Sequence, residues 1–400
     1  MTRPHQGGIR NHLNNLSKGW KTAGHTVYIY TPFGNYDSFP DKQKLVAQVE
    51  FLTQKYPILT FIFYVMAKHL LTIRILWALL VHSFDVINVR DVGAFNACFL
   101  PCKLFRVPIV LNLHGCLTND LFSKGMIKKK GRIYQYCLNE EKKSYRNCKY
   151  LVAVGPQERD NVFHIFPERK KNIPIIYNLV DTKQFHRNIE EGQKITKKLG
   201  LKKNSFKVLY VGRLSRRKGI DILIKTFSRF VKNTKAESNL ITIGVGPELD
   251  TLRRIASEKE ILELVVFTGL VKHKELNGYY NAADVVVIPS ISYRGYTEGT
   301  PTVALESMAS ERPLISTTLG GLRDIIINKK NGLTINENSV ESLLDALTNL
   351  YLDSKLRENL SISARKYILS SRSVEKVSAR WIEIFKAAIK GNKLTSNYGI

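Results

Sequence analysis

The chain has 400 residues, which is longer than one ordinary domain and predicts two domains of about 150 to 200 residues each. The composition, 44% hydrophobic and 24% charged, is that of a globular protein. Its five cysteines form neither an even set nor a paired CxxC arrangement, which argues against a disulfide scaffold or a structural zinc. The formal charge of +27 implies an anionic partner: a nucleic acid, an acidic membrane surface or a phosphorylated substrate.

Apolar strand-like runs alternate with helical patterns, which is typical of parallel sheets flanked by helices. In the first half, the predicted strands are residues 25–32, 84–90, 107–115, 149–155 and 173–178. In the second half, they are residues 206–214, 239–246, 264–270, 284–290 and 312–317. We expect two doubly wound α/β domains, at 1–186 and 206–370. A polar, lysine-rich linker at 187–205 joins them, and a C-terminal helix and polar tail at 371–400 packs back on the first domain.

One segment of the first half, residues 58–81, is apolar enough to suggest a membrane helix. Lys68, His69 and Arg74 interrupt it, and its uncharged core, "ILTFIFYVMA", is shorter than the roughly 20 residues that a spanning helix needs. We therefore expect that it does not span a membrane.

The stretch "GRLSRRKG", residues 212–219, follows a predicted strand and opens a helix. Arg213 leaves the carboxyl end of the strand, and Lys218 lies just before the first helical turn. Two cations there, with the positive end of the helix, can neutralise a diphosphate. A solvated basic turn is the alternative interpretation in so basic a chain.

The stretch "EGTPTVALES", residues 298–307, carries two carboxylates with seven residues between them. Thr300 is a good N-cap and Pro301 suits the first helical position, so Glu298 should lie in the loop before a helix and Glu306 in its second turn. The first-turn amides form an anion site, so the flanking carboxylates should accept hydrogen bonds from hydroxyl groups instead. A ligand with hydroxyls at both ends and phosphates between them is a nucleotide-sugar. A solvent-facing Glu306 and a loop charge at Glu298 are the alternative.

These motifs, together with "GVGPELDTLRR", "VVFTGLV", "AADVVVIPS" and "ESMASERPLISTTLGGLRDII", resemble the C-terminal half of glycosyltransferase family 4. That family comprises retaining, nucleotide-sugar-dependent enzymes of the GT-B fold, and the glutamate pair matches its E-x7-E signature. The stretches "PHQGGIRNHLNNLSKGWKTAGHTVYIYTP", "VLNLHG" and "IYNLVDTKQF" are similar to its other half. The resemblance implies two Rossmann-like domains that face each other across a cleft.

The resemblance also implies roles for the matching residues. Glu306 would hold the ribose hydroxyls and Glu298 those of the transferred sugar. Arg213 and Lys218 would bind the diphosphate and stabilise it as it leaves. His114 would sit beside the donor sugar, with a core histidine as the alternative. The remaining donor-binding positions would be Gly7, Gly8, Gly299, Thr300 and Thr302.

A retaining glycosyltransferase is the expected activity. Fixed cations and helix amides can stabilise the departing diphosphate, so neither a bound metal nor a cofactor is expected. No carboxylate is an evident double-displacement nucleophile, so the departing phosphate oxygen would help to take the acceptor's proton. Two other functions stay open: a nucleotide-sugar epimerase of related fold and a basic nucleic-acid-binding protein. Carboxylates beside a phosphate site would repel a polyanion, so no nucleic acid is expected as a partner.

A UDP-sugar carrying a hexose or N-acetylhexosamine is the expected donor, and a lipid-linked or cell-surface polysaccharide precursor the expected acceptor. An anionic membrane surface would then be a further partner. The residues that would meet it are those of 58–81, with Lys68 and Arg74, and the basic stretch 123–136, with Lys128, Lys129 and Lys130 among Met126, Ile127, Ile133 and Tyr134. A core helix at 58–81 is the alternative. We expect a cytoplasmic protein, peripheral on the inner face of the cytoplasmic membrane.

Three departures from the family pattern stand out. Glu311 and Leu179 occupy positions where the family usually or often has glycine, which questions the local turn geometry. Gly7 and Gly8 should follow a central strand, yet only "MTRPHQ" precedes them. We therefore expect the first domain to lack its first strand.

Overall fold

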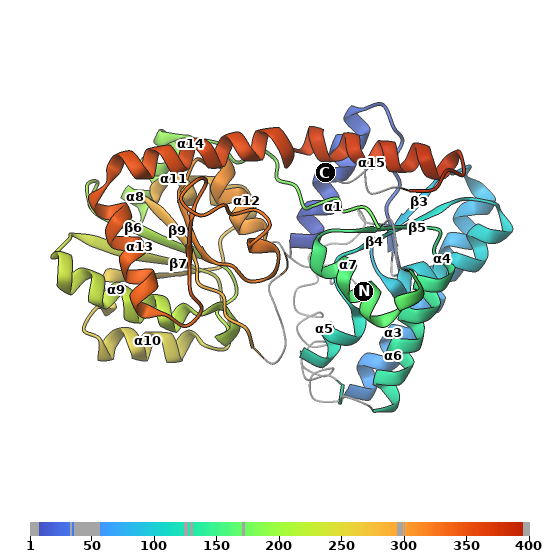
Figure 1. The fold of residues 1–400 in the computed structure, drawn as a ribbon, viewed down its shortest axis with the longest axis horizontal. Coiled ribbons are helices and arrows are strands. Elements are labelled where there is room, and N and C mark those ends of the chain that lie inside the picture. The colour runs from blue at the N-terminus through green and yellow to red at the C-terminus, as the bar shows by residue number, and fades with distance from the viewer. Residues whose placement is uncertain are drawn as a thin grey trace. The chain divides into compact units, whose positions relative to one another are not determined.

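Two separate parallel sheets, each flanked by helices, organise the chain (Figure 1). The computed structural model describes residues 8–32, 34–35, 57–123, 127–128, 131–169, 173–293, 299 and 301–394. The first unit comprises residues 1–177 and 377–400, and the second comprises residues 178–376. Both units are Rossmann-like, as the alternation of strands and helices predicted.

The first unit contains a three-stranded sheet in the order β3-β4-β5, with all strands parallel. Its strands are β3 (Ile87–Val89), β4 (Ile109–Leu113) and β5 (Tyr150–Ala153), and its longer helices are α1 (Gly8–Thr22), α3 (Pro57–Val81), α4 (Val92–Leu104), α6 (Arg132–Asn147) and α7 (Pro156–Ile165). The shorter elements are β1 (Tyr30–Thr31), β2 (Gly34–Asn35), α5 (Leu117–Ser123) and the 3-10 helix Pro167–Arg169. The apolar side chains of β4 and β5 are buried against α3, α4, α6 and α7, which explains why these short β-branched runs form the centre of the sheet.

Two strands predicted for this sheet were wrong. In place of a strand over 25–32, only β1 forms, and it pairs antiparallel with β2 in a sheet of its own. In place of 173–178, a single bridge joins Ile175 to Ala153. A strand extends only as far as a neighbouring strand can form backbone hydrogen bonds with it. Among the described residues, neither segment pairs with a neighbouring strand over a greater length. The predicted absence of a strand before Gly7 concerns residues 1–6, which lie outside the described residues.

Helix α15 (Val374–Ile389) begins in the second unit and belongs from residue 377 onward to the first. The indole of Trp381 is fully buried, and the ring of Phe385 packs edge-on against that of Trp20 from α1, 5.2 Å between centroids. These aromatic contacts tie the C-terminal segment to the start of the chain.

Helix α3 is apolar along most of its length and carries only Lys68, His69 and Arg74 as basic residues. Its stretch Phe61–Val81 has the length and mean hydropathy (1.5) of a spanning segment, so the expectation that it is too short was wrong by these two measures. One side of the helix nevertheless packs into the unit, because Tyr64, Leu71 and Ile75 are buried. Lys68 on the same helix donates to Glu140 of α6 at 3.0 Å. The opposite side remains exposed.

The second unit contains a six-stranded parallel sheet in the order β11-β10-β9-β6-β7-β8. The strands are β6 (Phe206–Val211), β7 (Ser238–Ile243), β8 (Val265–Gly269), β9 (Val285–Ile288), β10 (Leu314–Thr317) and β11 (Leu333–Ile335). The α-helices are α8 (Ile189–Lys198), α9 (Ile220–Thr234), α10 (Leu249–Glu258), α11 (Leu276–Ala282), α12 (Thr302–Ala309), α13 (Val340–Leu352) and α14 (Ser354–Ser371). The 3-10 helices are η3 (Arg216–Lys218), η4 (Leu262–Leu264), η5 (His273–Glu275) and η6 (Gly320–Leu322).

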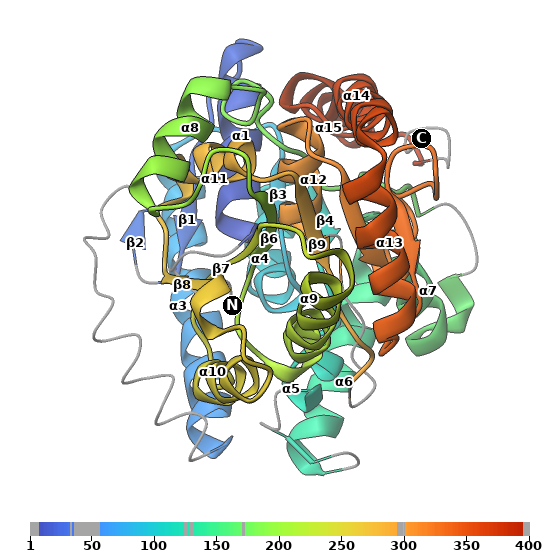
Figure 2. The same ribbon diagram turned by 90° about the vertical axis from the view of Figure 1, so that its left-hand side faces the viewer.

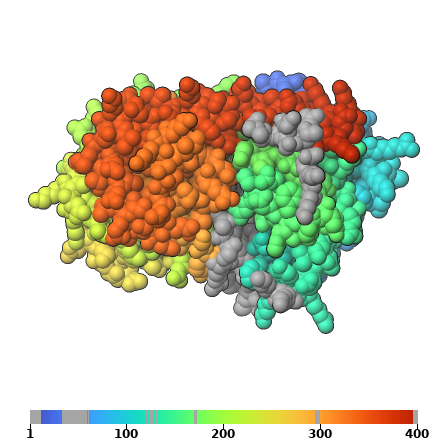
Figure 3. All heavy atoms as spheres, in the orientation of Figure 1, coloured from blue at the N-terminus to red at the C-terminus, as the bar shows by residue number. Residues whose placement is uncertain are grey.

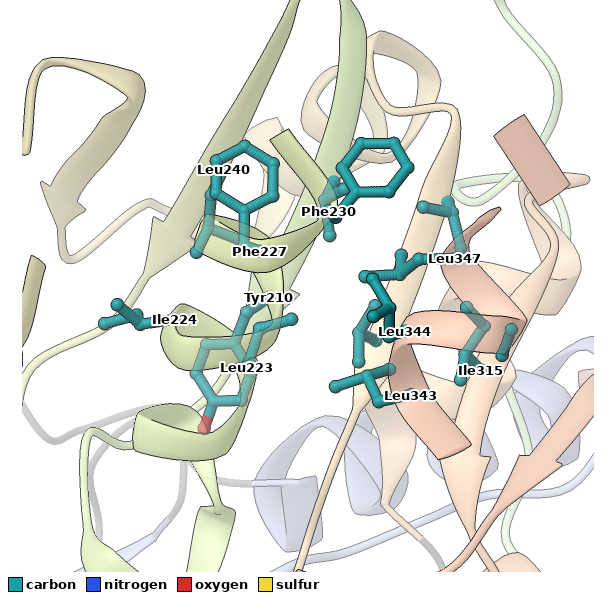
Figure 4. Close-up of a cluster of buried hydrophobic side chains, with 14 of the residues drawn as sticks. Tyr210, Leu223, Ile224, Phe227, Phe230, Leu240, Ile315, Leu343, Leu344 and Leu347 are labelled. Carbon is teal, nitrogen blue, oxygen red and sulfur yellow. The ribbon is translucent and has the colours of Figure 1, made fainter. Parts of the chain in front are cut away.

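Successive strand residues of this sheet point into two separate cores. Helices α9, α10 and α13 cover one face and α11, α12 and α14 the other (Figure 2). In the first core, Phe227 and Phe230 of α9 lie opposite Leu343 and Leu347 of α13 (Figure 4). Residues of α13 and α14, in orange and red, form much of the surface of this unit in Figure 3. Burial on both faces explains why these strands read as continuous apolar runs.

The linker predicted over 187–205 is not one in the structure. Helix α8 occupies most of it, packs against α11 and belongs to the second unit. Asn188 caps the helix by accepting from the amide of Glu191, and Glu190 and Glu191 lie in the first turn, where the helix dipole favours acidic residues. Its buried residues are Gly192 and Thr196, with Ile195 partly buried, so few large apolar side chains mark the helix in the sequence.

The structure accounts differently for the two departures from glycine. Glu311 adopts a left-handed conformation with φ of 54°, which is the conformation that glycine allows without strain. Leu179 is buried, only 2% exposed, and its φ is not positive. Of the two positions where glycine is replaced, only Glu311 therefore lies in a strained turn.

Replacing Glu311 with glycine should raise the free energy of unfolding of the second unit by roughly 0.5–1 kcal/mol, because it relieves the left-handed strain. The lost ion pair with Arg187, 3.6 Å long and partly exposed, should matter little. The measurement is a denaturant titration followed by far-UV circular dichroism. Glu311→Ala removes the same ion pair but keeps the strain, so it should give no gain.

Tryptophan emission provides an internal reference for this experiment. All three tryptophans, Trp20, Trp77 and Trp381, belong to the first unit, so their transition should not move. If Glu311→Gly and Glu311→Ala had equal free energies of unfolding, the backbone at Glu311 would not be strained.

Candidate active site

The strand order of the second unit contains a topological switch point. From β6 the chain continues to β7 on one side, while β9 pairs with β6 on the other. Ligands of doubly wound sheets bind beyond the carboxyl ends of the strands at such a point. Here those ends lead into the turn 212–219 after β6 and into the loop that starts at Pro289 after β9.

Backbone segments approach each other closely at this edge. A Cβ atom on Gly219, whose φ is 63°, would lie 2.0 Å from the carbonyl oxygen of Pro289. A Cβ on Gly244 would lie 1.9 Å from the carbonyl oxygen of Gly212. Both positions therefore exclude any side chain. The contacts hold the turn after β6 against the loops after β7 and β9.

The two cations of this turn are placed by its backbone. The hydroxyl of Tyr210 donates to the carbonyl of Arg213 at 3.0 Å, and the Arg213 side chain is exposed. Lys218 ends η3 and is partly exposed, and α9 begins two residues later. Arg213 and Lys218 thus flank one turn that leads from strand to helix, as the sequence predicted. An exposed cation beside a helix start suits an anionic ligand.

Helix α12 begins at Thr302, with Pro301 as its N-cap, one residue later than the sequence indicated. Glu306 lies in its second turn and is only 3% exposed, so the alternative of a solvent-facing Glu306 is wrong. One carboxylate oxygen of Glu306 accepts from the hydroxyl of Tyr280 at 2.8 Å, and the other lies 3.0 Å from Nε2 of His273. Each oxygen of a carboxylate has two lone pairs, so the group retains acceptor capacity for a ligand.

His273 and Tyr280 were missed by the sequence analysis. Because a carboxylate only accepts, Nε2 of His273 donates to Glu306, while the side-chain nitrogen of Gln184 lies 3.2 Å from Nδ1. Burial, followed by the carboxylate of Glu306, raises the pKa of Tyr280 well above its ordinary value. The only signal in the sequence was that polar and aromatic residues cluster in "KHKELNGYYN".

In the first unit, a second constellation lies at the carboxyl edge of the sheet. Arg90 directly follows β3 and His114 directly follows β4, its parallel neighbour. Nη1 of Arg90 lies 2.9 Å from Nε2 of His114, and the ring of His12 from α1 packs edge-on against His114 at 5.2 Å. Burial and the nearby Arg90 hold the pKa values of His114 and His12 well below the usual range. His114 is therefore a neutral side chain at the sheet edge.

The other predicted positions are only partly described. Gly8 begins α1, Gly299 is exposed and Thr302 begins α12. Gly7, Glu298 and Thr300 lie outside the described residues. Arg213, Lys218, Thr302 and Glu306 all belong to the second unit, and Gly8 and His114 to the first.

Comparisons with known proteins agree across both units. The family model described as "Glycosyltransferase Family 4" matches residues 6–184, and that described as "Glycosyl transferases group 1" matches residues 191–367. An uncharacterised glycosyltransferase of Methanocaldococcus jannaschii is 25% identical over 389 residues, 96% of this chain and 95% of its own. The alpha-monoglucosyldiacylglycerol synthase of Acholeplasma laidlawii is 24% identical over 369 residues, 90% of this chain and 89% of its own.

Solved structures show the same fold. Anabaena HepE in complex with UDP has a TM-score of 0.67 at 19% identity, covering 80% of this chain and 82% of its own. Sucrose-phosphate synthase from Thermosynechococcus elongatus also has a TM-score of 0.67 at 19% identity, covering 96% and 94%. The fold of this chain is therefore GT-B.

Tyr280→Phe should lower the free energy of unfolding of the second unit by about 2 kcal/mol, because it removes a donor from a buried carboxylate. Tyr279→Phe is the matched control, since Tyr279 is the neighbouring buried tyrosine of α11. Denaturant titration followed by circular dichroism measures both. Equal effects of the two variants would show that the hydroxyl of Tyr280 contributes nothing particular.

Proposed function

Because the chain is a glycosyltransferase of the group 1 family with the GT-B fold, we propose that it is a retaining enzyme that uses a nucleotide-sugar. It transfers a hexose or N-acetylhexosamine to a lipid-linked or cell-surface polysaccharide precursor. The observation that carries this proposal is the placement of Arg213 and Lys218 on one turn at the switch point of the second sheet. Family membership decides for glycosyl transfer against the epimerase alternative.

The reaction breaks the bond between the anomeric carbon of the donor sugar and the oxygen of the diphosphate. A new bond forms between that carbon and the acceptor's hydroxyl oxygen on the same face, and the hydroxyl proton passes to the departing phosphate oxygen. Negative charge grows on the diphosphate as it leaves, and Arg213, Lys218 and the amides at the start of α12 stabilise it. This charge stabilisation uses side chains and backbone and does not require a metal ion.

The donor is proposed to be a UDP-sugar. HepE, which shares the fold, was solved with UDP and also with UDP-glucose. In this chain Glu306 would accept from the ribose hydroxyls, and the hydrogen bonds from Tyr280 and His273 would orient its carboxylate for that contact. Glu298 would hold the hydroxyls of the transferred sugar.

Glu306→Gln should raise the Kd for UDP roughly ten-fold while changing kcat at saturating donor much less, because ribose contacts are equally strong in ground and transition states. Arg213→Ala and Lys218→Ala should instead lower kcat by about 100-fold, because their partner charge grows as the bond breaks. Calorimetry with UDP and transfer assays with UDP-sugars measure the two quantities.

Arg216→Ala is the matched control for the cations. Arg216 belongs to the same turn, is exposed, and stacks over the ring of Tyr293 at 5.7 Å. Its loss should leave kcat unchanged within a few fold. A large fall in kcat for Glu306→Gln with unchanged affinity for UDP would show that the roles are assigned wrongly.

The proposed acceptor requires that the enzyme work at a membrane, so we also propose a cytoplasmic enzyme that docks peripherally on an anionic bilayer. The name of the Acholeplasma relative, a monoglucosyldiacylglycerol synthase, refers to a glycolipid. The structure revises the residues expected to meet the bilayer. Lys68 is paired with Glu140 and Ile127 is buried, so neither is available. Met126, Lys129 and Lys130 lie outside the described residues.

An exposed apolar face of α3 supports the docking proposal. Its members recur at intervals of three or four residues, which places them on one side of the helix. They are Ile62, Met66, Leu70, Ile73, Leu76, Trp77, Leu80 and Val81, each at least 37% exposed. The neighbouring helix α4 adds Leu100 and Leu104, 70% and 72% exposed, with the exposed Lys103 between them. An apolar helix face with basic residues beside it suits the interface of an anionic membrane.

Ile73→Ser combined with Leu80→Ser should lower binding to anionic vesicles roughly ten-fold or more, because two half-exposed apolar side chains no longer enter the interface. Flotation with phosphatidylglycerol-containing liposomes measures it, and binding should also fall with added salt. Trp77 is 59% exposed while Trp20 and Trp381 are buried, so a blue shift of emission on binding reports Trp77.

Leu270→Ser combined with Leu352→Ser is the matched control. Both leucines belong to the second unit and are 67% and 73% exposed. This control should bind like the unmodified protein. Equal binding to neutral and anionic vesicles, or equal losses in the two double variants, would rule out docking through this face.

A further inference from the structure

Arg90 and His114 form a pair that the proposed reaction leaves unexplained. They leave the carboxyl ends of the neighbouring strands β3 and β4, the edge where doubly wound sheets hold their ligands. Both side chains remain partly exposed there. Nη1 of Arg90 and Nε2 of His114 are 2.9 Å apart.

The chemistry of the pair determines the tautomer of His114. A guanidinium group has only donors, so Nε2 of His114 must be the acceptor, and the ring proton must lie on Nδ1. A protonated imidazole would place a second N–H and a second positive charge against Arg90. The contact is therefore compatible only with a neutral ring.

No acidic side chain offsets the charge of Arg90 among the described residues. Burial alone lowers its pKa, to about 9, so Arg90 is still a cation at neutral pH. Its Nε and Nη2 atoms are buried without a hydrogen-bond partner in the described part of the chain. Proteins rarely bury cationic nitrogen atoms without a hydrogen-bond partner, because removing them from water is costly, so these two atoms call for an explanation.

His12 closes the other side of the pair. It is 2% exposed, and its ring packs edge-on against the ring of His114 at 75° between the planes. Arg90 and His12 are the charged or titratable groups that face His114 among the described residues. Together they restrict the rotation of the His114 ring. Its Nδ1 makes no hydrogen bond to any described residue.

We propose that Arg90 is a positioning residue that holds His114 in the neutral tautomer with the proton on Nδ1. His114 then donates a hydrogen bond from Nδ1 to an oxygen of a substrate bound at this sheet edge, and it has no free lone pair with which to act as a general base. This inference rests on the proposed glycosyl transfer, in which the departing phosphate, not a side chain, takes the proton of the acceptor.

The first experiment is nitrogen NMR of the full-length protein labelled with ¹⁵N-histidine, without nucleotide. The His114 signals, assigned by their loss in His114→Asn, should show the Nδ1–H tautomer and should not titrate between pH 8 and 5.5. In Arg90→Met, His114 should lose this tautomer preference, and its pKa should rise because the repulsion from Arg90 is gone, while burial, the larger cause, still holds it below the ordinary value. Arg90→Lys keeps a cationic donor and should restore much of the original behaviour.

The second experiment compares two substitutions of His114 in the transfer assay. The amide nitrogen of asparagine lies near the position of Nδ1, whereas that of glutamine lies near Nε2. His114→Asn should therefore retain kcat within about ten-fold, and His114→Gln should lose about 100-fold or more, as for other lost transition-state donors. If His114 acted as a general base, kcat should fall equally in both variants.

The outcomes separate this inference from the proposed function. Titration of wild-type His114 near pH 6.5, or an unchanged tautomer in Arg90→Met, would overturn the pairing whether or not transfer is observed. If Arg90→Met does not fold, the titration of wild-type His114 and the spectrum of Arg90→Lys still test whether Arg90 holds the tautomer of His114. Equal losses of kcat in His114→Asn and His114→Gln would overturn the role of His114 as a hydrogen-bond donor. A confirmed tautomer in a protein without transferase activity would contradict the proposed function alone.

Discussion

Close backbone packing at the carboxyl edge of the second sheet is the constraint on which the proposed donor site depends. Gly219 and Gly244 bring the turn after β6 against the loops after β9 and β7, at distances that no side chain allows. The turn that carries Arg213 and Lys218 is held by main-chain contacts and by the hydroxyl of the buried Tyr210. A diphosphate site built on such a frame needs little reorganisation as charge develops.

Buried charges in the two units are handled in different ways. Glu306 is satisfied on both oxygens, by Tyr280 and His273, so its burial costs little and its orientation is defined. Among the described residues, the side chain of Arg90 hydrogen-bonds only to the neutral His114, and its Nε and Nη2 atoms have no partner there. A satisfied charge serves stability and orientation, whereas an unsatisfied one is tolerated where it serves the site.

The net positive charge of the chain indicates its binding partners less directly than the position of its exposed apolar side chains does. Some cations, such as Lys68, are used inside the unit, and others surround the proposed diphosphate site. The exposed side of α3 is unusual because its opposite side already contributes to the core. A helix with apolar side chains on both its buried and its exposed side leaves a surface that water solvates poorly. This surface, together with Leu100 and Leu104, gives the docking proposal its residues.

The sequence by itself determined the fold class, the strands 206–211, 238–243, 265–269, 285–288 and 314–317, and the strand-turn-helix that carries Arg213 and Lys218. These features are local: period, β-branched runs and turn glycines lie within a few residues of one another. It missed β11, which is three residues long, and it misread α8, whose buried residues, Gly192 and Thr196, are not large apolar side chains. A strand predicted at 25–32 depended on a neighbour that the local pattern does not specify.

Only the tertiary structure decided which distant residues meet. Tyr280 and His273 are 26 and 33 residues from Glu306 along the chain, and Arg90 is 24 residues from His114. Their contacts follow from the order of strands in the sheets and from the positions of η5 and α11 beside α12, which single-sequence patterns do not encode. The protonation of His114 and the orientation of Glu306 are consequences of those contacts. The sequence therefore determined the elements and the candidate residues, because both depend on local chemistry. The tertiary structure alone decided their partners, because partners depend on which elements pack together.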